Sequence, residues 1–289
     1  MITHPFTYQA PATIEEAVQQ LGKGDDAKVI AGGHSLLPLM KLGLAQPETL
    51  IDLRRIASLH QIRTEADGTI VIGALVTHRD LAHDQTVRPK LAALADAAGE
   101  VGDLQVRARG TIGGSLAHAD PAADEPAPTL AYEATIRAIG PKGRRDIAAR
   151  DFFKGTFETA LAADEILAEI RFPAPTGRTG GAYAKFAHPA SGFAVTGVAA
   201  VVTIKSDGTI ERTAIAVAGA AAAPYRATAA ERALTGTKGD PKAIADAAGK
   251  AADGITALSD LAASAEYRKH LVTVYAKRAI ERAIQRARA

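Results

Sequence analysis

Lys28-Val-Ile-Ala-Gly-Gly-His-Ser-Leu-Leu-Pro38 is the stretch around which the chain is organised. The short apolar run at residues 29–31 predicts a buried strand, which ends at Gly32-Gly33. The hydroxyl residue Ser35 and the apolar pair Leu36-Leu37 follow. Paired glycines let a ligand approach the backbone and allow turns with φ > 0, whose N–H groups converge into a nest for an anion.

Gly110-Thr-Ile-Gly-Gly-Ser-Leu-Ala-His-Ala-Asp120 shows the same pattern. The β-branched pair Thr111-Ile112 precedes Gly113-Gly114, and the hydroxyl residue Ser115 and Leu116 come next. Two such loops in one chain suit a ligand that carries two phosphates. The alternative is that each glycine pair is only a turn that ends a strand.

Neither stretch is a standard phosphate-binding motif. The chain contains no Gly-x-x-x-x-Gly-Lys-Ser/Thr, which argues against a P-loop nucleotide hydrolase. Asp52 ends the next apolar run near the distance at which a Rossmann fold places its ribose-binding acid. However, Gly-Gly-His-Ser-Leu-Leu-Pro is not Gly-x-Gly-x-x-Gly, so nicotinamide binding in that manner is the weaker interpretation.

Size and composition are those of a globular protein with one large or two moderate domains. The chain has 289 residues, of which 47% are hydrophobic and 23% charged. The net charge of +2 gives no general attraction to nucleic acid or membrane. The absence of cysteine excludes disulfides and thiolate-held zinc or iron–sulfur clusters within this chain.

The chain start has neither the basic nor the apolar region of a secretory signal. The longest weakly polar run, residues 192–204, is too short to cross a bilayer and is expected to be a buried strand. We therefore expect no transmembrane segment, and a protein that is cytoplasmic or peripheral on the inner membrane face.

The N-terminal part predicts a capped helix and a small βαβ-like unit. Thr13-Ile-Glu-Glu16 is a capping box, and Gly22 and Gly24 end the helix that follows it. Strands are expected over residues 28–31 and 49–53, with a short helix through residues 39–42 between them.

The middle of the chain alternates strands with short helices. Thr77 caps a brief helix, and Pro89 suits the start of another. Strands are expected over residues 69–75, 134–139, 145–149 and 164–172, with the second and third joined as a hairpin.

The run from residue 173 to residue 181 is rich in Pro and Gly and is the candidate domain boundary. Beyond it, Ser206-Asp207-Gly208 is a hairpin signal between two strands. The strands are expected over residues 193–204 and 209–218, and helices over residues 227–234, 241–252 and 265–288. The last helix carries Arg278, Arg282 and Arg286 on one stripe, which is either a docking face for an acidic partner or nucleic acid, or a solvated face.

Four polar residues near the glycine stretches have two interpretations each. His34 and His118 could donate to a ligand or be hydrogen-bonded loop residues. Asp124 could accept hydrogen bonds from sugar or ribityl hydroxyls, or cap a helix. Lys185 lies in a β-like segment and could neutralise a phosphate or a reduced flavin, or point to solvent.

The sequence shows no independent catalytic machinery. It has no Gly-x-Ser-x-Gly, no convincing Ser/His/Asp set, and no acid–histidine cluster with metal-ligand spacing. We therefore expect neither a catalytic residue nor a metal ligand on this chain. A dinucleotide cradle without such groups is typical of a protein whose cofactor performs the chemistry.

These stretches resemble the FAD-binding medium subunit of the molybdenum hydroxylases, the carbon monoxide dehydrogenase and xanthine dehydrogenase family. Residues 31–41 resemble the first FAD loop of the family, and residues 109–124 resemble the second. Four shorter motifs recur in order, so that the similarity covers nearly the whole chain: Asp151-Phe-Phe, Asp164-Glu-Ile-Leu167, Gly181-Ala-Tyr-Ala-Lys185 and Ser264-Ala-Glu-Tyr-Arg268.

The resemblance implies a set of FAD-binding residues. Two loops would wrap the diphosphate and adjoining groups: Val29, Ile30, Ala31, Gly32, Gly33, His34, Ser35 and Leu36 in the first, and Thr111, Ile112, Gly113, Gly114 and Ser115 in the second. Asp124 would bind cofactor hydroxyls, Leu167 would lie against the flavin, and Lys185 would sit close to it. Phe193 falls where relatives close to carbon monoxide dehydrogenase often carry a tyrosine over the ring, and it lacks the hydroxyl.

The fold implied is α+β. A two-lobed α/β FAD-binding domain would span residues 1–177, with lobes of about 1–55 and 56–177. A smaller α+β domain with a three-stranded antiparallel sheet and helices would span residues 178–289.

The function implied is electron transfer within a dimer of heterotrimers. A molybdopterin large subunit would oxidise the substrate, and electrons would pass through iron–sulfur clusters on a small subunit to FAD on this chain. The final acceptor would be a quinone, NAD or another molecule. There are two alternatives. One is a stand-alone FAD-dependent oxidase or dehydrogenase of a small molecule, and the other is a non-enzymatic nucleotide-binding or interaction protein.

Overall fold

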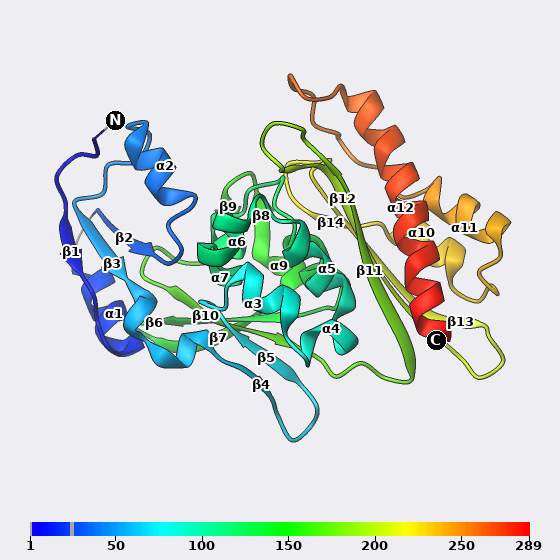
Figure 1. Ribbon diagram of the computed structural model, residues 1–289, viewed down its shortest axis with the longest axis horizontal. Helices are drawn as coiled ribbons and strands as arrows, with labels where there is room; N and C mark the ends of the chain where they lie inside the picture. Colours follow the sequence, from blue (N-terminus) through cyan, green and yellow to red (C-terminus); the bar gives the residue numbers. More distant parts are fainter. Residues whose placement is uncertain (1, 24–25) are drawn as a thin grey trace.

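A computed structural model describes residues 2–23 and 26–289 of the chain. Three sheets of three or more strands follow one another along the longest axis of the molecule, and helices pack between and outside them (Figure 1). This mixed architecture of helices and strands confirms the α+β class. Gly24, which was expected to help end the first helix, lies outside the described residues.

The first sheet is parallel and has the order β1-β3-β2. Its elements are β1 (Thr7–Gln9), α1 (Ile14–Leu21), β2 (Ala27–Ile30), α2 (Leu36–Lys41) and β3 (Thr49–Asp52). The Thr13 hydroxyl accepts the N–H of Glu16 and starts α1 as predicted. The helix α2 begins three residues earlier than expected. Asp52 accepts hydrogen bonds from Tyr8 and Arg54, so its carboxylate is used within the fold rather than in the Rossmann manner.

Two short 3₁₀ turns and an antiparallel sheet of five strands follow. The turns are η1 (Leu53–Arg55) and η2 (Ala57–His60), and the strand order is β4 (Ile62–Thr64), β5 (Ile70–Gly73), β10 (Ile166–Phe172), β6 (Thr135–Gly140) and β7 (Gly143–Ala148). The hairpin β6–β7 and the strand β10 confirm the predictions for these segments.

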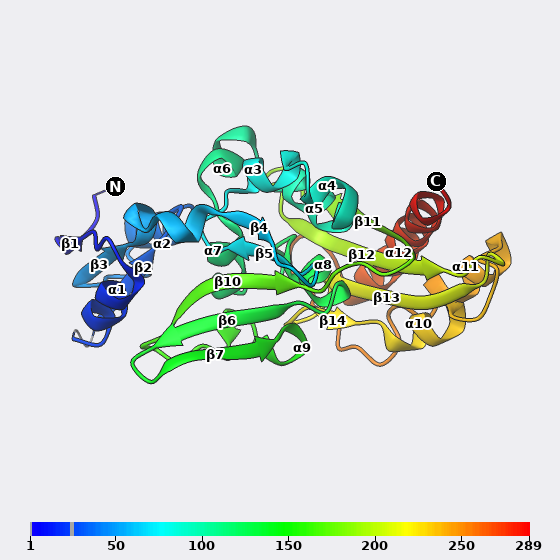
Figure 2. The same ribbon diagram turned by 90° about the horizontal axis from the view of Figure 1, so that it is seen from below.

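Helices cover this second sheet, and α7 packs against its central strand β10 (Figure 2). The helices of this region are α3 (His78–His83), α4 (Val87–Lys90), α5 (Ala92–Glu100), α6 (Leu104–Arg109), α7 (Ile112–His118), α8 (Pro126–Ala131) and α9 (Ala149–Phe152), and β8 (Phe153–Gly155) pairs with β9 (Glu158–Thr159). Thr77 caps α3 as predicted. The helix expected to start at Pro89 is instead two helices, because the backbone at Leu91 leaves the helical region and separates α4 from α5.

The third sheet consists of β11 (Arg178–Ala187), β12 (Ala194–Ile204), β13 (Ile210–Ala218) and β14 (Tyr225–Arg226), in that order. The first three are the antiparallel strands expected, and the two-residue β14 adds a short fourth strand. Gly208 has a φ of 82° in the hairpin between β12 and β13, a conformation that glycine adopts at little cost.

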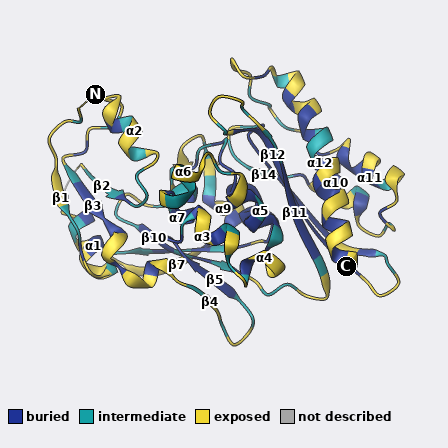
Figure 3. Cartoon of the chain, viewed as in Figure 1, coloured by how far each residue is buried: buried dark blue, intermediate teal, exposed yellow. Residues whose placement is uncertain are grey.

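Every residue of β12 is buried, because helices cover both faces of this sheet (Figure 3). The helices α5 and α8 pack on one face. The other face carries α10 (Thr228–Leu234), α11 (Pro241–Ala248) and α12 (Ala265–Arg288). A strand covered on both sides reads as a continuous apolar run, which is why its sequence predicted a buried strand.

Candidate functional site

The two glycine stretches lie against each other, although they are about 80 residues apart in sequence. A methyl group at Gly32 would overlap the carbonyl oxygen of Arg109 and lie 2.8 Å from the Cα of Gly110. A methyl group at Gly114 would lie 3.9 Å from the Cβ of Ala31. The absence of side chains therefore lets the two backbones meet and form one site.

The first stretch is a loop between β2 and α2 that presents unused hydrogen-bond donors. Gly33 has a φ of 77°, as expected for the predicted turn. Among the described residues, no acceptor is found for the backbone N–H groups of Gly32, Gly33, His34 and Ser35. The side chains of His34 and Ser35 are exposed and have no hydrogen-bond partner in the described part of the chain. These donors fit a negatively charged group such as a diphosphate.

The second stretch differs from the expectation of a second nest. Thr111 caps α7, and its hydroxyl accepts the N–H of Gly114 at 3.1 Å, so both glycines lie inside the helix with negative φ. The N–H of Gly113 donates to the carbonyl oxygen of Ala74 at 2.9 Å, and a methyl group at Gly113 would overlap Ala74. The prediction of a strand-ending turn is therefore wrong here. Gly113 allows close packing on Ala74, and Gly114 faces the first stretch.

Asp124 and Lys185 form a buried ion pair. Asp124 is 4% exposed, and its carboxylate accepts hydrogen bonds from the hydroxyl of Tyr183 at 2.7 Å and from Nζ of Lys185 at 2.9 Å. Nζ of Lys185 also donates to the carbonyl oxygen of Glu100 at 2.8 Å. Lys185 does not point to solvent, and Asp124 does not cap α8, which begins after Glu125. Burial raises the pKa of Asp124 to about 6, although the charge of Lys185 opposes this shift.

Leu167 lies on β10 of the second sheet, and Phe193 directly precedes β12 of the third sheet. Leu167 is buried on β10 in the same core as Ile112. Phe193 is half-exposed and lines a cavity of about 260 Å³ together with Asp120 and neighbouring residues that follow α7. The N–H of Ala194 donates to the carbonyl oxygen of Ala122 at 3.1 Å, which holds the start of β12 near this segment. His118 packs on the ring of Phe157, and its ring has no hydrogen-bond partner within residues 2–23 and 26–289.

Sequence reasoning missed His78 and Glu125. Nδ1 of His78 lies 2.5 Å from Oε1 of Glu125, and the other oxygen of Glu125 accepts the hydroxyl of Ser115 at 2.8 Å. Both side chains are almost completely buried. Because 47 positions separate His78 from Glu125, no local pattern indicates that they meet.

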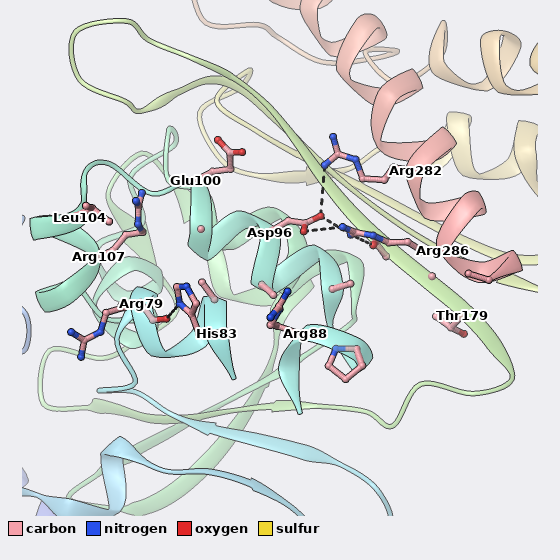
Figure 4. A pocket seen from close by; sticks show the side chains of 18 of the residues that line it. Arg79, His83, Arg88, Asp96, Glu100, Leu104, Arg107, Thr179, Arg282 and Arg286 are labelled. Atoms are coloured by element: carbon pink, nitrogen blue, oxygen red, sulfur yellow. Dashed lines mark hydrogen bonds and ion pairs between the residues drawn. The ribbon is translucent and has the colours of Figure 1, made fainter. Parts of the chain in front are cut away.

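A second, larger cavity of about 1000 Å³ lies between helices α3 to α6 on one side and β11 and α12 on the other (Figure 4). Arg286 donates to both carboxylate oxygens of Asp96, at 2.6 and 3.1 Å, and to the carbonyl oxygen of Gly181 at 2.7 Å. Arg282 donates to the carbonyl oxygen of Tyr183 at 3.1 Å. Arg282 also forms an ion pair with Asp96 at 3.9 Å, so both arginines hold α12 to β11 and to α5, while remaining partly exposed.

Comparison with known proteins agrees with this geometry. Residues 4–175 match the family model for the FAD binding domain in molybdopterin dehydrogenase. Residues 181–283 match the model for the C-terminal domain of the CO dehydrogenase flavoprotein. The chain belongs to the family of FAD-binding subunits of molybdopterin dehydrogenases. The gap between the two matched regions, residues 176–180, falls within the run 173–181 expected as the domain boundary, and the division into residues 1–177 and 178–289 stays a prediction.

Relatives in this family span the whole chain. The carbon monoxide dehydrogenase medium chain of Hydrogenophaga pseudoflava is 42% identical over 98% of both chains. A solved structure of carbon monoxide dehydrogenase from the same organism, which lacks the Mo-pyranopterin moiety, superimposes with a TM-score of 0.94 at 44% identity over 99% of both chains. Quinoline 2-oxidoreductase from Pseudomonas putida 86 gives a TM-score of 0.94 at 34% identity over the full length of both chains.

Membership of this family means that the chain is an FAD-binding medium subunit of a molybdenum hydroxylase, and therefore part of an oxidoreductase. These findings favour that role over a stand-alone flavin oxidase. Within residues 2–23 and 26–289, no helix has both the length and the apolar character needed to cross a membrane.

Proposed function

We propose that this chain is the electron-transfer subunit of a molybdenum hydroxylase complex. FAD, when bound, would supply reversible redox chemistry between iron–sulfur clusters on a small partner subunit and an external acceptor. A large partner subunit would hold the molybdopterin, in a dimer of heterotrimers. The observation that carries the proposal is the contact between the two glycine stretches. It places the N–H groups of residues 32–35, which have no acceptor among the described residues, next to residues 109–110 of the second stretch.

The first stretch would bind the diphosphate of FAD. The N–H groups of residues 32–35 and the hydroxyl of Ser35 would donate to phosphate oxygens, and the exposed ring of His34 would lie beside them. In the second stretch, Thr111 fixes the backbone by capping α7, and Gly114 leaves room for the ligand between the stretches.

The flavin and the sugar hydroxyls would meet the buried polar and apolar side chains. Asp124 has one hydrogen bond on each carboxylate oxygen, and a carboxylate offers about four acceptor positions, so it can also accept from a cofactor hydroxyl. Lys185 would hold Asp124 ionised, and its positive charge would lie close to the flavin. Leu167 and Phe193 would contact the ring system. Because Phe193 lacks a hydroxyl, it would act by apolar contact alone.

The first expected result concerns the cofactor and the partners. Affinity purification of the complex through a tag on this chain should yield about one FAD per chain, measured by flavin absorbance after denaturation. Molybdenum- and iron-containing subunits should co-purify in equal amounts. If the chain lacks flavin even after reconstitution with excess FAD, the proposed function is wrong.

We expect Gly114→Val to weaken FAD binding about tenfold. The new side chain would meet Oγ1 of Thr111 and approach Ala31, so the two stretches would be pushed apart. Titration of the apoprotein with FAD, followed by flavin fluorescence, measures the change. Gly99→Val is the matched control, because Gly99 is exposed and, beyond its own helix, Ala82 at 4.0 Å is the one neighbour of an added Cβ among the described residues. Equal affinities for wild type and Gly114→Val would contradict the assignment of this stretch.

A further inference from the structure

His78 and Glu125 form a buried pair that none of the FAD contacts proposed above uses. Nδ1 of His78 and Oε1 of Glu125 are 2.5 Å apart, and the two side chains are 6% and 1% exposed. The remaining carboxylate oxygen of Glu125 accepts the hydroxyl hydrogen of Ser115 at 2.8 Å. Through Glu125, His78 is therefore linked to Ser115, the residue that follows the glycine pair of the second stretch.

His78 also supports the beginning of that stretch. Its backbone N–H donates to the carbonyl oxygen of Gly110 at 3.0 Å, and a methyl group at Gly110 would lie 2.6 Å from Nε2 of its ring. The stretch is further fixed by the N–H of Ile112, which donates to the carbonyl oxygen of Val76 at 3.1 Å. The Cα of Gly110 lies in turn beside Gly32 of the first stretch. The imidazole ring thus lies directly behind the point where the two stretches meet.

We propose that His78 and Glu125 are positioning residues for FAD, which hold residues 110–115 of the second glycine stretch against the first. This inference rests on the proposed function. Neither side chain is expected to touch the cofactor. The pair acts through Gly110 and Ser115, and loss of either member should loosen the contact between the stretches without removing a ligand of FAD.

The charges around the pair make this positioning depend on pH. Burial disfavours the protonated form of His78, but the charge of Glu125 and its close contact with Nδ1 outweigh burial and raise the pKa of His78 above its ordinary 6.5. Burial also disfavours ionised Glu125, yet the charge of His78 and the hydrogen bonds lower its pKa. The other charged groups that face His78 are Asp124, which favours its protonation, and Arg107, which opposes it.

The direction of the pH effect follows from the raised pKa. Because the folded protein holds this proton more tightly than the unfolded chain, the stabilising contribution is complete below pH 6.5 and is lost as pH rises through the raised pKa of His78. Above that pH, Glu125 is a buried carboxylate whose only other side-chain partner in the described structure is Ser115. FAD affinity should therefore fall on the alkaline side.

The test measures FAD affinity of the full-length apoprotein from pH 6 to pH 9 by flavin fluorescence. Wild-type affinity should fall severalfold as pH rises, whereas His78→Gln and Glu125→Gln should each bind about tenfold more weakly at pH 6 and show a flat profile. The double variant should lose about as much as one single variant, because the two residues act as one unit. His78→Leu should bind more weakly than His78→Gln, which keeps a donor.

Controls separate this inference from the proposed function. His83→Gln, which changes an exposed histidine of the same helix, should behave as wild type, and His34→Gln should keep the pH dependence. If wild type binds FAD with the same affinity from pH 6 to pH 9, the inference is overturned, even if the variants do not fold. Affinity of folded His78→Gln within twofold of wild type at pH 6 also overturns it. If wild type binds no FAD, it is the proposed function that fails.

Discussion

Gly32→Ala should reduce FAD affinity at least 100-fold, the largest effect that we expect from a single methyl group in this protein. The added Cβ would overlap the carbonyl oxygen of Arg109 and lie 2.8 Å from the Cα of Gly110. Both are backbone atoms, so no side-chain rotation can relieve the clash. The two stretches must separate, and the donors of residues 32–35 move away from the second half of the site.

Flavin fluorescence titration and thermal unfolding of the apoprotein together measure this effect. Overpacking of this kind typically costs about 1–3 kcal/mol, so the unfolding temperature should also fall by several degrees. Gly99→Ala, at an exposed helical position with space for a methyl group, should be neutral or slightly stabilising. Wild-type FAD affinity in Gly32→Ala would show that the contact between the stretches is not needed for binding.

Arg268→Ala should lower the free energy of unfolding by about 3–5 kcal/mol. Arg268 is 4% exposed, and its Nη1 donates to the carbonyl oxygens of Val195 and Gly219, each at 2.6 Å. Removing the guanidinium leaves the buried carbonyl of Gly219 without a donor from the described residues. It also creates a cavity between α12 and the start of β12. Denaturant unfolding measures the loss.

Asp260→Asn distinguishes the ion pair of Arg268 with Asp260 from its two hydrogen bonds to backbone carbonyls. Asp260 accepts a hydrogen bond from Nη2 of Arg268 at 2.6 Å, but its side chain is 52% exposed. An ion pair with one partner in solvent contributes little, so Asp260→Asn should cost less than about 1 kcal/mol. If it costs as much as Arg268→Ala, the ion pair rather than the two carbonyl contacts stabilises this region.

Local features of the fold could be predicted from the sequence because their causes are local. The cap at Thr13, the hairpin turn at Gly208 and the long helix α12 each depend on a few neighbouring residues. The first glycine stretch belongs to the same class, since Gly33 adopts the positive φ that its position after a strand predicts. The strand β12 was recognisable because burial on both faces leaves a continuous apolar run.

Errors occurred where a residue's role depends on distant partners. The second glycine pair has the same local pattern as the first, but Thr111 caps a helix there and Ala74 occupies the space that a side chain would need. One of the two interpretations of Asp124, a helix cap, is wrong, because its carboxylate accepts hydrogen bonds from Tyr183 and Lys185 of β11. A sequence window contains none of these partners.

The residues proposed to contact FAD could be named from the sequence and the family resemblance. The residues that support them from behind could not. The glycines, Asp124 and Lys185 are residue types that attract attention in a sequence. His78 and Glu125 do not, because an isolated histidine and an isolated glutamate have no meaning until the fold brings them within 2.5 Å. Which residues contact FAD stays a prediction until the titrations above are made.

The ion pair between Asp96 and Arg286 can form only late in the synthesis of the chain. The two residues are 190 positions apart, and ribosomes add about 5–20 residues per second, so roughly 10–40 s of synthesis separate them. The segment that carries both glycine stretches is therefore synthesised long before Arg286, which pairs with Asp96. In the nascent chain, α5 would lack its arginine partners until translation is almost finished. Premature termination near residue 280 would release a polypeptide without Arg282 and Arg286, in which α12 is not bound to α5 through Asp96.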